Sequence, residues 1–212
     1  MGFLKLSMIV SIGGIIQMTA SMAQTNTKSN CWNFDTEKIS EIAKGFSNDV
    51  GQWKVLADDS APSKGNVLAQ LAKSEKTAYN VTFIIDTQYK NVDLSVKLKA
   101  IAGEIDQGGG VVWRAKDAQN YYVCRYNPLE KNFRVYKVVG GKRDELGSAD
   151  VSDVKGWHTI RVVMNGDRIE CHLDGKKLLE VSDSTITVAG RIGLWTKADG
   201  QTYFDDLTAT GE

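Results

Sequence analysis

The chain has little of several residue types that often build chemical sites. Its 212 residues include only three cysteines, two histidines and two prolines, and its formal net charge is +0. So few cysteines exclude a disulfide framework as the basis of the fold. The balanced charge gives no electrostatic case for nucleic acid or an acidic membrane surface. A zinc site needs three or four ligands, which Cys171 and His172 together do not supply.

Motifs of nucleophilic and phosphate chemistry are also missing. A Ser-His-Asp triad would use His158 or His172, but no serine lies in a nucleophile elbow. The three glycines at 108–110 precede neither a helix nor a Lys-Ser/Thr pair, so they do not form a phosphate loop. We expect them instead to permit a bulge or a close approach of another backbone segment.

The long apolar run of the sequence lies at its N-terminus. Lys5 precedes an apolar stretch at 6–16, and the small-residue segment 21–23 follows. This pattern predicts a signal peptide over 1–23, because the run is too short to span a membrane. We therefore expect an exported periplasmic or extracellular protein, with no membrane contact after cleavage; a retained anchor is the alternative. A disordered segment over 24–30 and a single domain over 31–212 are expected to follow.

From about residue 46 onward the sequence has the pattern of short antiparallel strands. Leu94, Val96 and Leu98 alternate with polar residues, which predicts a strand with one buried face. Asn-Gly and Asp-Gly pairs favour hairpins, because both central residues of such turns need a positive φ. These pairs, at 165–166, 174–175 and 199–200, separate predicted strands at 159–164, 168–173, 177–181, 191–196 and 202–208. One helix is predicted, at 36–44.

The densest group of signals lies in the segment 108–143, which reads as three strands carrying aromatic and basic residues. Side chains two apart on a strand share a face. Tyr121 and Arg125 are therefore predicted to share one face of their strand, opposite Tyr122, Cys124 and Tyr126. An arginine in an apolar strand is costly to bury without a partner.

Five residues form the candidate ligand-binding group. Aromatic faces stack on the apolar faces of sugar rings, and basic side chains donate hydrogen bonds to sugar hydroxyls. The sequence therefore indicates a carbohydrate partner for Arg114, Tyr121, Arg125, Trp195 and Lys197. Trp195 fits a core position equally well, and Trp113, Tyr122 and Tyr136 are predicted to lie in the core. Cys124 and Cys171 both fall within strands, where they either pair or remain buried thiols.

Motifs along nearly the whole mature chain resemble exported bacterial proteins with the concanavalin A-like lectin/glucanase jelly roll. The matching pieces include Gly51-x-Trp53-x-Val55, Asn66 to Gln70, Asp106 to Gly110 with Trp113-Arg114, Asn120-Tyr121-Tyr122, Asn127 to Glu130, Gly193 to Asp199 and Tyr203 to Leu207. The chain is similar to the 3-keto-disaccharide hydrolase domain and laminin G-like groups. The resemblance implies an all-β jelly-roll sandwich of two antiparallel sheets with a saccharide on its concave face.

The resemblance leaves activity open. Laminarinase-type enzymes use Glu-x-Asp followed by a second glutamate, but Gly108 and Gly109 stand where that acid is needed after Glu104 and Asp106. That mechanism is therefore excluded, and the two acids are expected in a turn. A hydrolase of a disaccharide or 3-keto-disaccharide would draw its acid and base from Glu104, Asp106, Glu130 or Asp199. A laminin G-like interaction module without a small ligand is the third alternative.

The resemblance also raises a structural calcium ion as a cofactor; no other cofactor is expected. Jelly-roll relatives often bind calcium where the first and last strands meet, through carboxylates and backbone carbonyls. The donors that this implies are Asp35, Asp205 and Asp206. The alternative is that Asp205 caps a turn or pairs with a lysine, while Asp206 is solvated.

Overall fold

The structure is a computed structural model that describes residues 1–2, 28–152 and 155–212. Two antiparallel sheets face one another across a shared core. The larger sheet contains β1 (Lys28–Trp32), β2 (Trp53–Asp58), β3 (Gly65–Gln70), β5 (Val92–Ala102), β10 (His158–Asn165), β11 (Arg168–Leu173), β12 (Lys176–Ser182) and β14 (Gln201–Gly211). The six-stranded sheet contains β4 (Tyr79–Phe83), β6 (Gly109–Asp117), β7 (Asn120–Asn127), β8 (Asn132–Val139), β9 (Lys142–Asp150) and β13 (Arg191–Lys197). The predicted all-β jelly-roll sandwich is confirmed.

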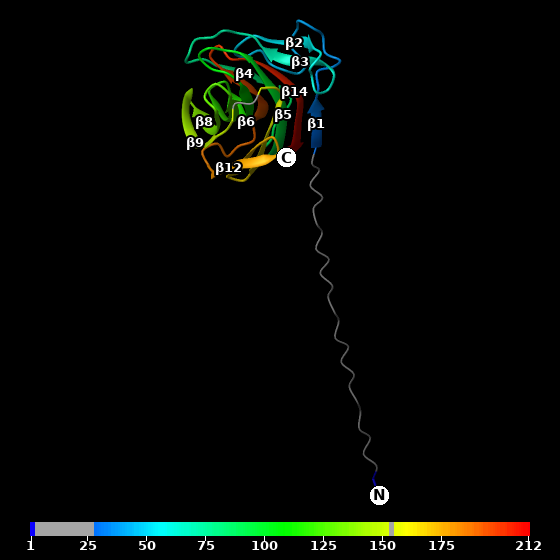
Figure 1. Cartoon of the computed structure of the whole chain (residues 1–212). Coiled ribbons are helices and arrows are strands. Elements are labelled where there is room, and N and C mark those ends of the chain that lie inside the picture. The colour runs from blue at the N-terminus through cyan, green and yellow to red at the C-terminus, as the bar shows by residue number, and fades with distance from the viewer. Residues whose placement is uncertain (3–27, 153–154) are drawn as a thin grey trace.

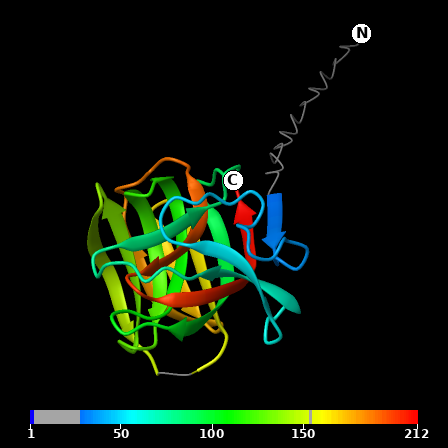
Figure 2. The ribbon, with the colours of Figure 1, turned by 90° about the horizontal axis from the view of Figure 1, so that it is seen from above.

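The strand order brings distant parts of the chain together. The eight-stranded sheet has the order β12-β11-β10-β5-β14-β3-β2, and β1 pairs with β14. The six-stranded sheet has the order β4-β13-β6-β7-β8-β9. In Figure 1, β8 and β9 lie at the left of the domain and β14 and β1 at the right. Figure 2 shows the red C-terminal strand beside the blue β1.

Side-chain alternation explains the two faces of the six-stranded sheet. On β7, Tyr122, Cys124 and Tyr126 enter the core between the sheets. Tyr121 and Val123 belong to a separate apolar cluster on the opposite side. The predicted division of β7 between two faces is therefore confirmed. We call the side that carries the second cluster the outer face.

The glycine-rich start of β6 allows close strand packing. A β carbon at Gly110 would lie 1.8 Å from the carbonyl oxygen of Cys124 on the adjacent β7. Gly108 has φ +77°, and its β carbon would lie 2.2 Å from the carbonyl oxygen of Tyr126. The prediction that these glycines permit a close backbone approach is confirmed.

The predicted helix at 36–44 is wrong. The segment forms turns, and Ser40 has φ +70°, which a helix does not tolerate. Its backbone pairs instead with β2, since the amide of Ser40 donates to the carbonyl of Val55 and the amide of Val55 donates to the carbonyl of Glu41. Ala43 is buried and Ile42 packs against the core from this irregular segment, whereas Ile39 is 50% exposed.

The predictions for the N-terminus have different outcomes. Almost all of the predicted signal peptide over 1–23 lies outside the described residues. Disorder over 24–30 is wrong for residues 28–30, which begin β1 and pair with the end of β14. In the parts of the chain that the structure describes, we find no helix with the length and apolarity needed to cross a membrane.

The cysteine pair lies in the core without a disulfide. Cys124 on β7 and Cys171 on β11 are free, buried thiols, and Cys31 is free and exposed. Burial raises the pKa of Cys124, and the neighbouring Cys171 raises it further. The two thiols therefore behave as small apolar side chains between the sheets.

Candidate functional site

The outer face of the six-stranded sheet carries aromatic side chains that are almost completely buried. Trp195 on β13 is 1% exposed and Tyr136 on β8 is 3% exposed. The indole nitrogen of Trp195 donates a hydrogen bond to the hydroxyl of Tyr121 at 3.1 Å. Tyr79 on β4 lies against Trp195, with their ring centroids 5.6 Å apart. The structure thus places Trp195 and Tyr121 together, and Tyr136, which is buried as predicted, belongs to the same outer-face cluster.

Arginine side chains cover these rings. The guanidinium carbon of Arg143 on β9 lies 4.3 Å from the ring centroid of Tyr136, 5.4 Å from that of Tyr79 and 5.8 Å from that of Trp195. Such contacts are attractive because the ring face carries partial negative charge. Among the described residues, the buried Nη1 of Arg143 has no hydrogen-bond partner. Nη1 of Arg143 can therefore donate a hydrogen bond to a ligand bound over these aromatic rings.

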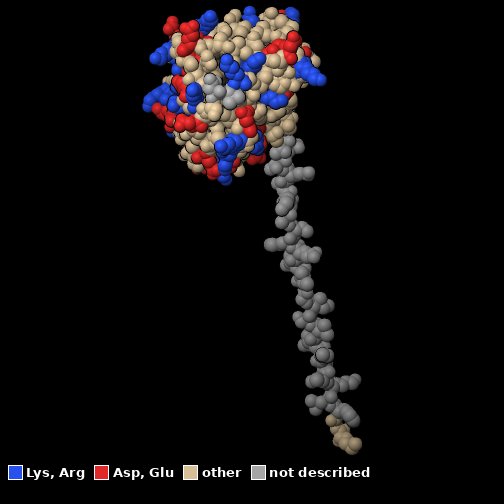
Figure 3. Space-filling model, viewed as in Figure 1, with Lys and Arg blue, Asp and Glu red and all other residues tan. Residues whose placement is uncertain are grey.

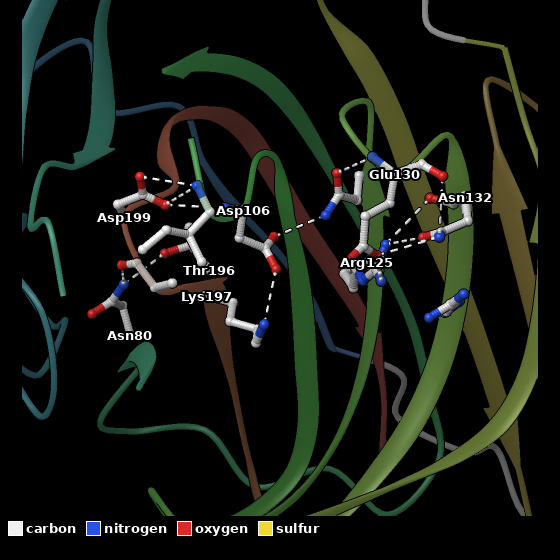
Figure 4. Close-up of polar contacts among 12 residues, drawn as sticks. Asn80, Asp106, Arg125, Glu130, Asn132, Thr196, Lys197 and Asp199 are labelled. Atoms are coloured by element: carbon white, nitrogen blue, oxygen red, sulfur yellow. Dashed lines mark hydrogen bonds and ion pairs between the residues drawn. The ribbon is translucent and has the colours of Figure 1, made fainter. Parts of the chain in front are cut away.

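A network of charged groups continues across the same face, as Figure 4 shows. Asp106 lies between Lys197, 3.3 Å from its carboxylate, and Asn127, whose amide donates to it at 2.9 Å. The guanidinium of Arg125 forms an ion pair with Glu130 at 2.8 Å and donates to the side-chain oxygen of Asn132. The buried arginine that the sequence predicted to need a partner therefore has one.

The two carboxyl groups of this network have pKa values shifted in opposite directions. Burial raises the pKa of Asp106, although Lys197 and Arg125 act against that shift. Burial also acts to raise the pKa of Glu130, but Arg125 and the hydrogen bond from Asn132 outweigh it and leave the pKa lowered. One network thus contains one carboxyl group whose pKa is raised and another whose pKa is lowered.

Asp199 positions the loop that carries Asp106. Its carboxylate accepts hydrogen bonds from the backbone amides of Glu104, Ile105 and Asp106 at 2.7, 3.1 and 3.0 Å. These three bonds outweigh the effect of partial burial and lower the pKa of Asp199. Glu104 is exposed at a bend, as the sequence predicts for a turn. Of the four candidate acids, only Asp106 and Glu130 belong to the charged network.

Arg114 lies away from this group. It has φ +47° at an irregularity of β6, where regular side-chain alternation breaks. Its guanidinium donates to the backbone carbonyls of Lys90, Gly166 and Ile186, each at 2.7 Å. These hydrogen bonds connect Arg114 to three other segments of the sandwich. Because its guanidinium is occupied by these carbonyls, we do not include Arg114 in the site.

The predicted calcium donors are only partly brought together. Ser63 Oγ lies 3.0 Å from Asp35 Oδ1, 2.9 Å from Asp205 Oδ2 and 3.1 Å from the carbonyl oxygen of Asn33. One hydroxyl hydrogen cannot satisfy these acceptors, and such oxygens are the ligands that calcium prefers. Asp206 instead forms an ion pair with Lys97 at 2.8 Å. Asp35, Asp205, Ser63 and Asn33 fit the ion; Asp206 does not.

Two further observations bear on this cluster. Burial raises the pKa of Asp205, so its charge is costly where it lies. The backbone amide of Ser63 donates to the same carboxylate at 2.9 Å, so Asp205 also caps a turn. The described part of the chain contains no group of three or more histidine, cysteine or acidic residues arranged to hold a metal. The cluster would therefore rely on neutral oxygens for part of its coordination.

Sequence reasoning missed several residues of the outer face. Tyr79, Asn127, Asn132 and Arg143 come from β4, β7, β8 and β9, and only the strand order places them beside Trp195 and Lys197. A signal existed for Arg143, which follows the Gly140-Gly141 turn and pairs with Val138 of the outer cluster. On the surface that Figure 3 shows, basic and acidic side chains are interspersed, in agreement with the balanced charge.

Comparison with known proteins identifies the family. Residues 42–210 match the model of the 3-keto-alpha-glucoside-1,2-lyase-like domain. The chain belongs to this family. A comparison of the lyase-like domain with curated proteins gave no match.

Solved structures support the fold of this lyase-like domain. Carbohydrate binding module CBM66 from Bacillus subtilis has a TM-score of 0.65 at 16% identity, with 78% of this chain and 94% of that chain covered. A Bacillus subtilis protein of unknown function with a galectin-like fold has a TM-score of 0.61 at 12% identity, with 86% and 97% covered. A putative glycosyl hydrolase from Parabacteroides distasonis has a TM-score of 0.55 at 17% identity, with 86% and 100% covered. The fold is thus shared with carbohydrate-related proteins.

Proposed function

We propose that the outer face of the six-stranded sheet binds a saccharide. The observation that carries this proposal is Arg143, which stacks over three aromatic rings and keeps a buried nitrogen without a hydrogen-bond partner in the described chain. A polar group left unpaired at a buried position is costly, and a ligand acceptor removes that cost. The family assignment and the carbohydrate-binding structural relative support a sugar as that ligand.

The neighbouring groups suit sugar hydroxyls. Lys197 is partly exposed beside the buried Asp106, and Glu130 keeps 41% of its side chain exposed beside Arg125. A saccharide hydroxyl both donates and accepts, so it can bridge a carboxylate and a basic group. The side chain of Tyr79 is partly exposed at the border of the aromatic layer and can contact a ring. The polar groups of this face can thereby orient a bound saccharide, and the ring of Tyr79 can contact it.

A glycan array followed by calorimetry tests the proposal. We expect Arg143→Gln to weaken binding of the best glycan about tenfold, the equivalent of one charge-assisted hydrogen bond. The matched control is Arg161→Gln, because Arg161 lies on β10 of the other sheet in a half-exposed pair with Asp93. Equal binding by the two variants would contradict the proposal. No glycan above background would favour an interaction module instead.

A second candidate function is cleavage of a glycosidic bond in a 3-keto-glucoside. The opposite pKa shifts of Asp106 and Glu130 favour it, because such a pair divides the roles of acid and base. In an elimination, Glu130 would remove the proton on carbon 2, next to the ketone. A carbon 1–carbon 2 double bond then forms as the carbon 1–oxygen bond breaks, and Asp106 would protonate the leaving oxygen.

Incubation with a 3-keto-glycoside and chromatography of the products test this second function. An unsaturated keto sugar would indicate elimination, whereas a product that has gained water would indicate hydrolysis. We expect Glu130→Gln and Asp106→Asn each to lower the rate by at least about a hundredfold. Undiminished turnover by both variants would exclude these roles, and no turnover by the unaltered chain would leave binding as the function.

We also infer that the protein acts outside the cytoplasm, on the strength of the signal-peptide pattern at 1–23. Expression in a bacterial host followed by N-terminal sequencing of the exported product tests this. A mature chain that begins at Gln24 is expected. An uncleaved chain held in the cytoplasm would contradict it.

A further inference from the structure

A cavity lies at one end of the sandwich, apart from the outer-face group. Its volume is about 630 Å³, within the about 300–1,000 Å³ of small-molecule sites. The walls come from the end of β5, the β5–β6 and β7–β8 connections and the segment before β10. The lining residues are Lys99, Ala100, Ile101, Gln107, Tyr126, Pro128, Leu129, Lys131, Lys155, Gly156 and His158. We call this cavity the end pocket.

The charge of the end pocket has one sign. The described residues that line it include three lysines and no acidic residue. Lys99 is held by Ser60 at 2.9 Å and lies 3.9 Å from Asp58, so its charge is partly compensated. Among the residues that the structure describes, neither Lys131 nor Lys155 has an ion pair or a side-chain hydrogen bond. Two ammonium groups at the same opening therefore attract an anion.

The pocket lining also includes large apolar and aromatic side chains beside the polar Gln107 and His158. Leu129 is 48% exposed and Ile101 is 41% exposed, although both are large apolar side chains. Tyr126 and His158 are buried and lie in contact, with ring centroids 4.8 Å apart. A ligand that is only an ion would leave this apolar surface in water. A ligand with a ring beside its anionic group would cover it.

We propose that the end pocket binds a small molecule that carries a carboxylate on a six-membered ring. Lys131 and Lys155 contact the carboxylate, and the ring lies against Leu129 and Ile101. Two sources share this chemistry, an acidic sugar such as a uronic acid and an aromatic acid. The pocket uses none of the outer-face residues, so the proposal does not rest on saccharide binding there.

Nuclear magnetic resonance of the isotope-labelled mature chain tests this site. The probes are glucuronate and benzoate, each paired with a neutral counterpart, glucose or benzyl alcohol. We expect at least one acid to shift the backbone amides of Gln107, Leu129 and Gly156, with its neutral counterpart binding at least about tenfold more weakly. A shift by glucuronate alone identifies an acidic sugar, and a stronger shift by benzoate identifies an aromatic acid.

Variants complete the test. The combined change Lys131→Gln and Lys155→Gln removes both exposed ammonium groups and is expected to reduce the affinity for the acid about tenfold or more. Lys116→Gln is the matched control, because Lys116 is exposed near the far end of β6. Equal affinity for acid and neutral probe, unchanged affinity in the double variant, or no shift of the pocket amides would each overturn the proposal. A shift confined to outer-face amides would also overturn it while leaving the proposed function intact.

Discussion

The outward-facing sides of the two sheets differ, although both belong to the same sandwich. On the eight-stranded sheet, charged side chains pair at the water surface, as Arg161 does with Asp93 and Lys97 with Asp206. On the six-stranded sheet, Trp195 and Tyr121 are buried in a cluster separate from the core between the sheets. Arg143 lies over the rings of Trp195, Tyr79 and Tyr136. We propose this face as the ligand site because the buried Nη1 of Arg143 has no hydrogen-bond partner among the described residues.

The largest difference between the two faces is expected in stability. Trp195→Ala removes a buried aromatic side chain and its hydrogen bond to Tyr121, and we expect it to lower the free energy of unfolding by about 3–5 kcal/mol. Arg161→Ala on the opposite sheet breaks a half-exposed ion pair and should cost about 0–1 kcal/mol. Urea denaturation of both variants measures this. Equal losses would remove the distinction between the faces.

The calcium prediction concerns the eight-stranded sheet, where the β2–β3 connection meets β14. If the cluster around Ser63 holds calcium, the ion at about 100 times its dissociation constant stabilises the fold by about 2.7 kcal/mol. We expect a higher melting temperature with calcium than with a chelator, and loss of that difference in Asp205→Asn. Asp206→Asn is the control, because Asp206 pairs with Lys97 outside the cluster. A calcium response that survives Asp205→Asn would contradict the assignment.

A smaller effect is expected from the residue that positions Asp106. Asp199→Asn keeps one acceptor oxygen for the three backbone amides but loses the charge. We expect a loss of about 1 kcal/mol in stability, after allowance for solvent screening, and a separate several-fold loss in glycan affinity. Hydrogen exchange of the amides at 104–106 should become faster in the variant. Unchanged exchange there would show that Asp199 does not hold the loop.

The smallest expected effect is a pair of opposite pH dependences. The pKa of Asp106 is raised in the folded protein. Its protonated form therefore stabilises the fold fully at pH values below the unfolded pKa of about 3.9. This stabilisation is lost as the pH rises through the folded pKa. The pKa of Glu130 is lowered in the folded protein. Its ionised form therefore stabilises the fold fully at pH values above the unfolded pKa of about 4.3, and this stabilisation is lost as the pH falls through the folded pKa. Asp106→Asn and Glu130→Gln should therefore change the pH dependence of unfolding in opposite directions. Slopes of the same sign in urea titrations would contradict the network.

Local sequence pattern was sufficient for most of the fold. The alternation on β5 and β7 and the Asp174-Gly175 turn, in which both residues have positive φ, depend only on neighbouring residues. The 165–166 turn is displaced by one residue, since Gly166 and Asp167 form it. The helix at 36–44 failed because its backbone instead forms hydrogen bonds with Val55 of β2, the next strand along the chain. The periodicity of a local segment does not show whether its backbone will form hydrogen bonds within a helix or with another strand.

The site was predicted less completely, for two physical reasons. A bulge breaks alternation at Arg114, so its side chain leaves the face that the spacing indicates. Alternation also does not say which of two apolar faces lies between the sheets; Tyr136 is buried as predicted, but in the cluster on the outer face. The contact between Asp106 and Lys197 joins residues 91 positions apart, and only the strand order creates it.

The central claim is that a saccharide binds the outer face of the six-stranded sheet, and a crystal structure with the best glycan from the array tests it most directly. The account predicts a sugar within hydrogen-bond distance of Arg143 and close to Tyr79 and Lys197. The same crystals of Arg143→Gln should show weaker or absent sugar density. A sugar bound only on the eight-stranded sheet or at the loops, with Arg143 uninvolved, would contradict the claim.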